Sequence, residues 1–429
     1  MPRVGTTPTL VLTLALAAAF TVACGAAEGT PAPAPAAPPS ACASGGLYQG
    51  IGKSRVLMGF SGADAVAKLA PFDLRYLYLA GPLFDGAGPC ASCASGCSAG
   101  GVSCANAVGC GWWGCWQYDQ VPPGQYAADF VARAGADGEI PMFTYYVILP
   151  ASGVVEGKAE ATVAARDAGF MARYLADWRF LLRRIGTASA FLHVEPDFWG
   201  YAQHAAIDAG TGAHGLPAAV ASANPSDCAG FEESIAGLGR CMIAMVRKYA
   251  PNARVGLHAS GWGTKVDVLQ NASASLDVAA EGAKLGRFLV ECGADLGDFV
   301  VADMSDRDAG WYQRQVPPRN TWWDASNATL PDFHQAFAWA KSVSAAVGRP
   351  VLWWQIPVGN MSLPNAPGAW QDNRVDYLLS HPAEVAASGG FGLAFGAGAS
   401  DQTTPSSDGG NLVGQVNAYA ASGGAALCP

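Results

Sequence analysis

Short apolar runs alternate along the chain with longer segments in which apolar residues recur every three or four positions. The short runs are rich in β-branched and aromatic residues, which is typical of strands, whereas the longer spacing is typical of helices that bury one face. The predicted strands cover residues 55–60, 75–80, 140–147, 190–195, 254–259, 299–304, 350–355 and 391–395. The predicted helices cover residues 125–135, 159–185, 231–249, 275–292, 333–347 and 374–388.

The order of these segments predicts the fold class. Strands that alternate with helices form parallel β–α–β units, and eight such units predict a single α/β domain, a (β/α)8 TIM barrel, over residues 46–429. A doubly wound open sheet is the alternative, and it is expected to carry a glycine-rich phosphate turn after its first strand. The segment Ser61-Gly62-Ala63-Asp64 has no GxGxxG pattern, and no Walker motif occurs in the chain. The barrel is therefore favoured.

Residues 1–24 have the features of an export signal. Arg3 precedes a short apolar stretch, residues 10–20, which is too short to cross a bilayer and is followed by Thr21-Val22-Ala23-Cys24. The segment resembles a bacterial lipoprotein signal, and this resemblance implies that Cys24 is lipidated. Thr21 stands where that motif usually has Leu, so cleavage and full secretion stay open as the alternative. Residues 25–45, rich in Ala and Pro, are predicted to form a tether.

Composition and charge narrow the range of partners. The chain of 429 residues is 51% hydrophobic and only 14% charged, which supplies a large buried core. Its net charge of -9, without a long basic run, argues against nucleic acid and against anionic membrane surfaces. We therefore expect a monomer that contacts a membrane only through a lipid anchor, and we predict no cofactor.

Twelve cysteines fit an exported protein, because disulfides persist in oxidising compartments. Six of them follow the second predicted strand in a Gly-, Ser- and Ala-rich stretch: Cys90, Cys93, Cys97, Cys104, Cys110 and Cys115. This insertion has too few apolar residues to fold on its own core, so we predict a disulfide-linked flap over the carboxyl ends of the strands. Zinc is the alternative, although a second Cys-x-x-Cys pair and a nearby His are missing.

The remaining cysteines lie elsewhere in the chain. Cys42 and Cys428 are predicted to pair where the two ends of a barrel meet in space. Cys228, Cys241 and Cys292 cannot all pair among themselves. The connection after the fourth strand, residues 198–227, is predicted to be a second long non-helical loop on the same face as the flap.

Acidic residues stand at the ends of two predicted strands. His193, Glu195 and Asp197 alternate along the end of the fourth strand and are expected to share one side. Asp303 ends the sixth strand in the same way. Because barrel active sites lie at the carboxyl ends of the strands, these acids are expected to converge. A strand or loop cap, or a salt bridge, is the simpler alternative for each acid alone. It is favoured for Asp306 and Asp308, which lie beside Arg307.

Two carboxyls with different pKa values suit glycoside hydrolysis, which needs one protonated acid and one ionised partner. Burial among Trp rings raises a carboxyl pKa, so Glu195 is the predicted acid and Asp303 or Asp197 the base. Aromatic and polar side chains near the strand ends are the predicted sugar contacts. These are Trp199, Tyr201, His193, His258, Trp311, Trp353, Trp354 and Gln355.

This arrangement resembles secreted bacterial glycoside hydrolases with a barrel fold. In their large retaining superfamily, the acid is a Glu directly after Asn at the end of strand 4, and the nucleophile is a Glu at the end of strand 7. Glu195 matches the first position but follows Val194, and Gln355 stands at the second. The resemblance implies action on a polysaccharide or oligosaccharide. Gln355 favours an inverting mechanism, with the two carboxyls about 6.5–9.5 Å apart.

Other functions have weaker support in the sequence. His193, Glu195, His258 and Asp303 are potential metal ligands, but no His-x-His or His-Glu-x-x-His pattern occurs, so no metal is predicted. Gly-x-Ser-x-Gly is also absent, which argues against a serine hydrolase. A carbohydrate-binding barrel without turnover is the main alternative, because the seventh strand lacks a terminal carboxylate.

Overall fold

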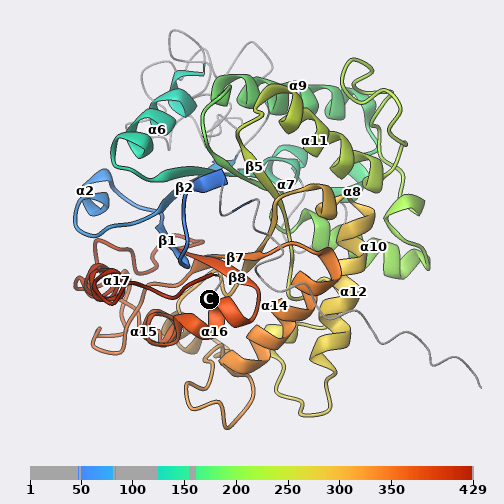
Figure 1. The fold of residues 1–429 in the computed structure, drawn as a ribbon. Coiled ribbons are helices and arrows are strands. Elements are labelled where there is room, and N and C mark those ends of the chain that lie inside the picture. Colours follow the sequence, from blue (N-terminus) through green and yellow to red (C-terminus); the bar gives the residue numbers. More distant parts are fainter. Residues whose placement is uncertain (1–46, 48–49, 81–82, 84–123, 154–160, 428–429) are drawn as a thin grey trace, which may run out of the picture. The chain divides into compact units, whose positions relative to one another are not determined.

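The computed structural model describes residues 47, 50–80, 83, 124–153 and 161–427 (Figure 1). The chain divides into residues 1–38 and 39–429, and only the second part contains described residues. The predictions for Cys24, for the tether and for the 42–428 cysteine pair fall outside the described residues. So does the predicted flap, with all six of its cysteines.

Eight parallel strands close into one barrel, in which each strand pairs with its neighbours in chain order and β8 pairs with β1. The strands are β1 (Leu57–Phe60), β2 (Leu74–Ala80), β3 (Ile140–Tyr146), β4 (Phe191–Val194), β5 (Arg254–His258), β6 (Phe299–Asp303), β7 (Val351–Ile356) and β8 (Gly390–Phe395). The predicted barrel is confirmed, and each predicted strand lies within two residues of the observed one at either end.

Helices surround the strands in Figure 1. They are α2 (Asp64–Ala67), α6 (Gln125–Ala136), α7 (Ile148–Ser152), α8 (Ala161–Ala164), α9 (Ala168–Ile185), α10 (Phe198–Ala209), α11 (Ile235–Tyr249), α12 (Val278–Glu291), α13 (Ala309–Gln313), α14 (Phe333–Val347), α15 (Arg374–Ser380), α16 (Pro382–Ala387) and α17 (Asn411–Ala421). Short polar side chains begin several of them. Asp167, Ser234 and Asp332 each accept a hydrogen bond from a backbone N–H of the first turn of α9, α11 and α14.

Three of the predictions need correction. The segment 159–185 contains two helices, α8 and α9, because Asp167 caps a new helix that begins at Ala168. The segment 374–388 is divided into α15 and α16, because Pro382 at the start of α16 cannot continue the hydrogen bonding of the preceding helix. The predicted loop after β4 begins with α10 instead. Most residues in the first two turns of α10 are buried, including Phe198, Trp199 and Tyr201. A helix buried on most sides has no alternating polar face by which its sequence would reveal it.

The barrel interior is filled by layers of side chains. Phe191, Phe299 and Phe391, from β4, β6 and β8, form one layer with ring centroids 5.1–6.1 Å apart. Alternate strands contribute such layers in this fold. Because strand side chains alternate, the next inward residue of β4 is His193, which lies one layer nearer the carboxyl ends.

The described cysteines include one disulfide. Cys228, before α11, bonds to Cys241 within α11, with the two Cα atoms 5.4 Å apart. Cys292 is buried and, among the described cysteines, has no disulfide partner. None of the described helices is long and apolar enough to cross a membrane.

Candidate functional site

A cavity of about 320 Å³ lies at the carboxyl ends of the strands. Four aspartates line it, and they come from the connections after β4, β5 and β6 and from β6 itself: Asp197, Asp267, Asp303 and Asp306. The other polar lining includes His258, Gln355 and two arginines, Arg307 and Arg319. The site is therefore rich in groups that exchange protons and form hydrogen bonds.

Asp303 reaches this cavity because β6 remains regular to its end. Phe299 and Asp303 are four residues apart, so both side chains face the barrel interior. The Oδ1 atom of Asp303 lies 3.3 Å from Nε2 of His258, the last residue of β5. The sequence-predicted residues Asp303 and His258 thus lie side by side in the cavity.

Glu195 does not line the cavity, although it follows β4 directly. The strand ends at Val194, and Glu195 adopts a left-handed φ of 50°. Its fully buried carboxyl group accepts hydrogen bonds from the N–H groups of Val147 and Ile148, each at 3.2 Å to Oε1. The expected alternation fails here because the extended backbone ends one residue earlier. Glu195 is therefore a capping residue of the kind named as the simpler alternative: its carboxyl group is bound by backbone amides.

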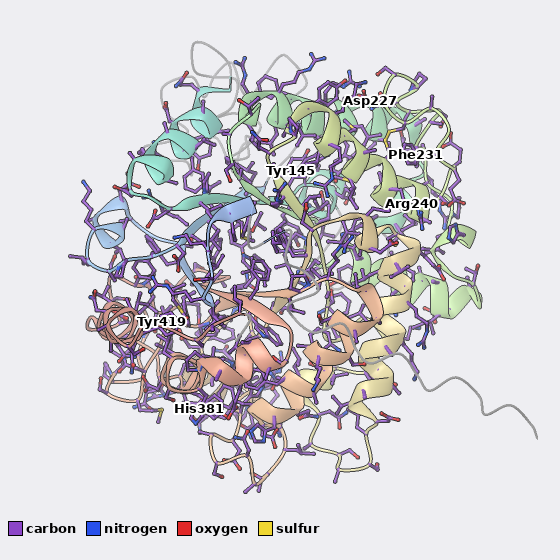
Figure 2. The ribbon with its side chains drawn as sticks, in the orientation of Figure 1. Tyr145, Asp227, Phe231, Arg240, His381 and Tyr419 are labelled. Carbon is purple, nitrogen blue, oxygen red and sulfur yellow. A yellow bond between two sulfur atoms is a disulfide. The ribbon has the colours of Figure 1, made fainter. Side chains whose placement is uncertain are left out.

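The surroundings of Glu195 form a buried polar network behind β3 and β4. The Tyr174 hydroxyl, from α9, donates to Glu195 Oε1 at 2.9 Å. Nearby, Tyr145, labelled in Figure 2, donates to Asp177 at 2.7 Å. Burial raises the pKa of Glu195 to about 8, and the hydrogen bonds from Tyr174, Ile148 and Val147 offset only part of that rise. The carboxyl has the raised pKa expected of an acid, but its position gives that predicted role no support.

Asp197 and Tyr201 lie on the cavity wall, as the sequence predicted. Asp197 also has a left-handed φ, 66°, and its side chain does not cap α10. Strained backbone of this kind costs about 1–3 kcal/mol and persists where the surrounding structure holds it. The turn between β4 and α10 thus directs Asp197 to the cavity and Glu195 away from it.

Asp267 is a cavity residue that the sequence analysis missed. It lies in the connection after β5, just before a short 3-10 helix, Val268–Gln270. Burial raises its pKa, and the negative charge of Asp303 raises that pKa further. No strand or motif marks Asp267 in the sequence, because a loop brings it to the cavity.

The predicted sugar contacts divide into two groups. His258, Trp354, Gln355 and Tyr201 line the cavity, whereas Trp199, Trp353, His193 and Trp311 do not. Trp199 is buried, and its Nε1–H donates to the Val194 carbonyl at 2.9 Å. Trp353 packs on Trp339 of α14, at 6.1 Å between ring centroids. Consecutive strand residues point to opposite faces, so only one residue of the Trp353-Trp354 pair can face inward.

His193 and Trp311 lie beside cavity residues without lining it. The His193 ring is buried and stacks on His258 with centroids 5.1 Å apart. Trp311 lies under the Arg307 guanidinium, 4.7 Å from its ring centroid. The aromatic residues that line the cavity but were not predicted are Tyr78, Tyr146, Trp262 and Tyr312.

An irregularity in β7 brings two consecutive residues to the cavity. The pairing of β7 with β8 shifts between Trp353 and Ile356, and Gln355 has a φ of 56°. A bulge of this kind redirects a side chain, so Trp354 and Gln355 both line the site. The Gln355 amide Nε2 donates to the Tyr78 hydroxyl on β2, across the barrel opening.

The Asp306-Arg307-Asp308 segment is largely structural. Asp306 forms an ion pair with Arg307 and accepts a hydrogen bond from Tyr312. Asp308 is buried and accepts hydrogen bonds from the N–H groups of Gly359 and Thr403, each at 2.9 Å. The alternative predicted for these two acids, a cap or a salt bridge, is confirmed. Asp306 and Arg307 also contribute to the cavity wall.

Among the described residues, no group of three or more His, Cys, Asp or Glu side chains is arranged to hold a metal ion.

Comparisons with known proteins give distant matches only. No protein-family model matches the sequence, and no curated protein does. The solved structures similar to this chain include glycoside hydrolases. A modular endo-β-1,4-mannanase from Cellulomonas fimi is 12% identical, with 89% of this chain and 74% of that chain covered and a TM-score of 0.47. Endo-glycoceramidase II from Rhodococcus sp. is 10% identical, with 86% and 79% covered and a TM-score of 0.44.

A family 26 β-mannanase from Bacteroides ovatus is 10% identical, with 90% of this chain and 93% of that chain covered and a TM-score of 0.42. At these identities and TM-scores, we base neither the fold nor the function of this protein on the likeness.

Proposed function

We propose that this protein is a glycoside hydrolase that acts on a polysaccharide or oligosaccharide. One observation carries the proposal: Asp197, Asp267 and Asp303 reach a single cavity, lined with aromatic rings, at the carboxyl end of a closed barrel. Active sites of barrel enzymes lie at this end. A carboxyl pair with separated pKa values is the chemical requirement for glycoside hydrolysis.

Within this proposal, Asp267 replaces Glu195 as the acid. Burial and the charge of Asp303 both raise the pKa of Asp267, which favours a proton on that residue. Asp303 is the ionised partner, held beside His258. Asp197, the second base suggested by the sequence, lies in the same cavity and is the alternative partner.

The cavity walls supply groups suited to a sugar. The rings of Trp262, Trp354, Tyr201 and Tyr312 line the cavity and contribute apolar surface, which suits the C–H groups of a pyranose ring. Gln355 is placed to hydrogen-bond sugar hydroxyls. Its presence at the end of β7, where a retaining enzyme would carry a nucleophile, supports our expectation of inversion. Proton NMR of the first anomer released tests that expectation.

A carbohydrate-binding protein without turnover is the second candidate. It is favoured by two observations. The strand-end acid Glu195 is sequestered from the cavity, and β7 carries the amide Gln355 near its end rather than a carboxylate. Binding to a polysaccharide without release of reducing sugar would favour this candidate.

Export, and the disulfide-linked flap after β2, stay part of the proposal. The Cys228–Cys241 disulfide supports an oxidising compartment. Lipidation of Cys24 is tested by comparing the membrane fractions of cells that express the chain or its Cys24→Ser variant. Pairing of Cys42 with Cys428 is tested by mass spectrometry of the unreduced protein.

The test of the enzymatic function is reducing-sugar release by the purified protein on a panel of polysaccharides that differ in sugar and linkage. Release that is lost in Asp303→Asn supports the proposal. The absence of both release and binding across the panel would overturn it.

A further inference from the structure

Four polar side chains form a continuous chain of contacts that ends at the cavity. Thr144 Oγ1 lies 3.2 Å from His193 Nδ1, and His193 Nε2 lies 3.0 Å from His258 Nδ1. His258 Nε2 then lies 3.3 Å from Asp303 Oδ1. Of these residues, His258 and Asp303 line the cavity, whereas Thr144 and His193 are buried behind it.

The register of the barrel builds this chain. The four residues belong to the consecutive strands β3, β4, β5 and β6. Thr144 pairs level with His193, His193 pairs with Gly256 two residues before His258, and His258 pairs with Val301 two residues before Asp303. The contacts therefore climb toward the carboxyl ends from strand to strand, as the stagger of a closed barrel requires.

The contact between His258 and Asp303 is the last link of this chain. In the described part of the protein, His258 Nε2 and Asp303 Oδ1 are both buried and neither has a hydrogen-bond partner. The 3.3 Å between them is an ion-pair distance, but the contact does not have hydrogen-bond geometry. A buried polar atom without a partner is costly. A small rotation that aligns the imidazole N–H with the carboxylate is therefore favoured, because it satisfies both atoms at once.

The directions of the hydrogen bonds follow from this last link. If neutral His258 carries its proton on Nε2, its Nδ1 accepts from His193 Nε2–H. The His193 Nδ1 atom then accepts from the Thr144 hydroxyl. Burial and the neighbouring His258 lower the pKa of His193 well below its usual value, which keeps that ring neutral. If His258 is charged, the hydrogen bonds between His258 and His193 and between His193 and Thr144 both reverse direction. The Nε2–H of His258 still points to Asp303 in that case.

We propose that His193, supported by Thr144, is a positioning residue that fixes the His258 ring so that its Nε2–H holds Asp303 as an ionised carboxylate. The inference rests on the proposed hydrolase function and deepens it, because it assigns Asp303 to the base and leaves proton donation to Asp267. Trp354 supports the arrangement, with its ring edge-on to both imidazoles at 4.6 and 5.8 Å between centroids.

Other titratable groups also face Asp303. Asp267, from the connection after β5, and Tyr78, on β2, both have their pKa values raised in part by the charge of Asp303. The pH dependence of activity therefore reports Asp303 together with Asp267. A change in the chain of contacts through His193 is expected to move only the acidic limb of the pH–activity profile, because that limb follows ionisation of the base.

The experiment compares two variants at one position. His193→Gln retains an N–H donor toward His258 and an acceptor toward Thr144, whereas His193→Phe retains a ring but removes both. We expect His193→Phe to lower kcat on the order of 10–100-fold, with a smaller change in KM. The acidic limb of its kcat/KM profile is expected to move up by about one pH unit. His193→Gln is expected to stay near the unsubstituted protein in both respects.

Phe391→Leu is the matched control, because it alters a buried ring in the lower layer of the barrel without touching the chain of contacts. It is expected to reduce thermal stability and to leave the pH profile unchanged. If His193→Phe also changes only stability, His193 is structural and the inference fails.

Asp303→Asn separates the two proposals. If Asp303→Asn retains full activity, the assignment of Asp303 in the proposed function fails. If Asp303→Asn is inactive while His193→Phe retains its activity and pH profile, the proposed function stands and only the positioning role is overturned.

Discussion

Glu195 and Asp303 occupy equivalent places in the sequence and opposite environments in the structure. Each stands at the end of an apolar run, yet Asp303 faces the cavity beside His258. Glu195 is turned into the layer between strands and helices, where Tyr174 and two backbone N–H groups bind its carboxyl. The pKa of Glu195 is raised to about 8, mainly by burial. An acid at a strand end and a raised pKa are thus insufficient to identify a catalytic acid.

The difference arises in the backbone. β6 is extended through Asp303, so the alternation of side chains predicts correctly which way Asp303 points. β4 ends at Val194, and the next residue adopts a left-handed conformation. One residue of difference in strand length therefore decides which carboxyl faces the cavity.

The largest expected effect separates the two carboxyls by activity. Asp303→Asn removes the ionised partner and is expected to lower kcat on the order of 10²–10⁴-fold without a comparable loss of stability. Glu195→Gln, measured at pH 6, is expected to keep kcat within about threefold, because Glu195 does not line the cavity. Reducing-sugar release under saturating substrate is the measurement. Equal losses in both variants would restore Glu195 as the acid.

A second activity test concerns Asp267, which we propose as the acid. Asp267→Asn is expected to lower kcat about 10²-fold or more on natural linkages, because the leaving oxygen loses its proton donor. An activated aryl glycoside needs little protonation and is expected to lose much less. Comparing the two substrate types measures this difference. A loss independent of the leaving group would assign Asp267 to substrate binding instead.

The pH dependence of stability tests the environment of Glu195. The pKa of Glu195 is about 8 in the folded protein, and its ordinary value is 4.5. Between these two pH values, the folded protein retains a proton that the unfolded chain releases. The stability that this residue contributes is fully present below about pH 4.5 and is lost as the pH rises through 8. Relative to Glu195→Gln, the free energy of unfolding of the unsubstituted protein is expected to fall by an amount on the order of a few kcal/mol between pH 5 and 9.

Denaturant unfolding of both proteins at several pH values measures this difference. Titrations elsewhere in the molecule are shared by the two proteins and cancel. Parallel stability curves across this pH range would contradict the raised pKa.

The smallest expected effect is that of Tyr174→Phe. It removes the hydroxyl that donates to Glu195 and is expected to lower the free energy of unfolding by about 1 kcal/mol, with kcat unchanged. Unfolding and activity assays on one preparation test both expectations. A marked fall in kcat would link the network around Glu195 to the cavity after all.

The sequence predicted well wherever one local periodicity decided the outcome. Eight apolar runs separated by helical segments were sufficient for the barrel, and the strand ends were placed to within two residues. Asp303, Asp197, His258 and Trp354 were predicted as site residues, and all of them line one cavity. These positions follow from chain order and from the alternation of side chains, which are properties of neighbouring residues.

The sequence failed where a loop or an irregular backbone set the position. Asp267 arrives from a loop without a motif, and Trp262 from the same connection. α10 was missed because most of its first two turns are buried. Trp199 and Trp353 were predicted as sugar contacts from their residue type, but they pack against the backbone of β4 and against α14.

By itself, the sequence determined the number of strands, their order and the face on which polar residues would gather, because hydrophobic periodicity is a local property that the barrel topology preserves. Only the tertiary structure decided which of those polar residues share the cavity and which are bound behind it. That choice depends on where each strand stops being extended, on the stagger between strands and on which partners satisfy a buried carboxyl. These are relations between residues tens of positions apart, such as His258 with Asp303 and Glu195 with Val147.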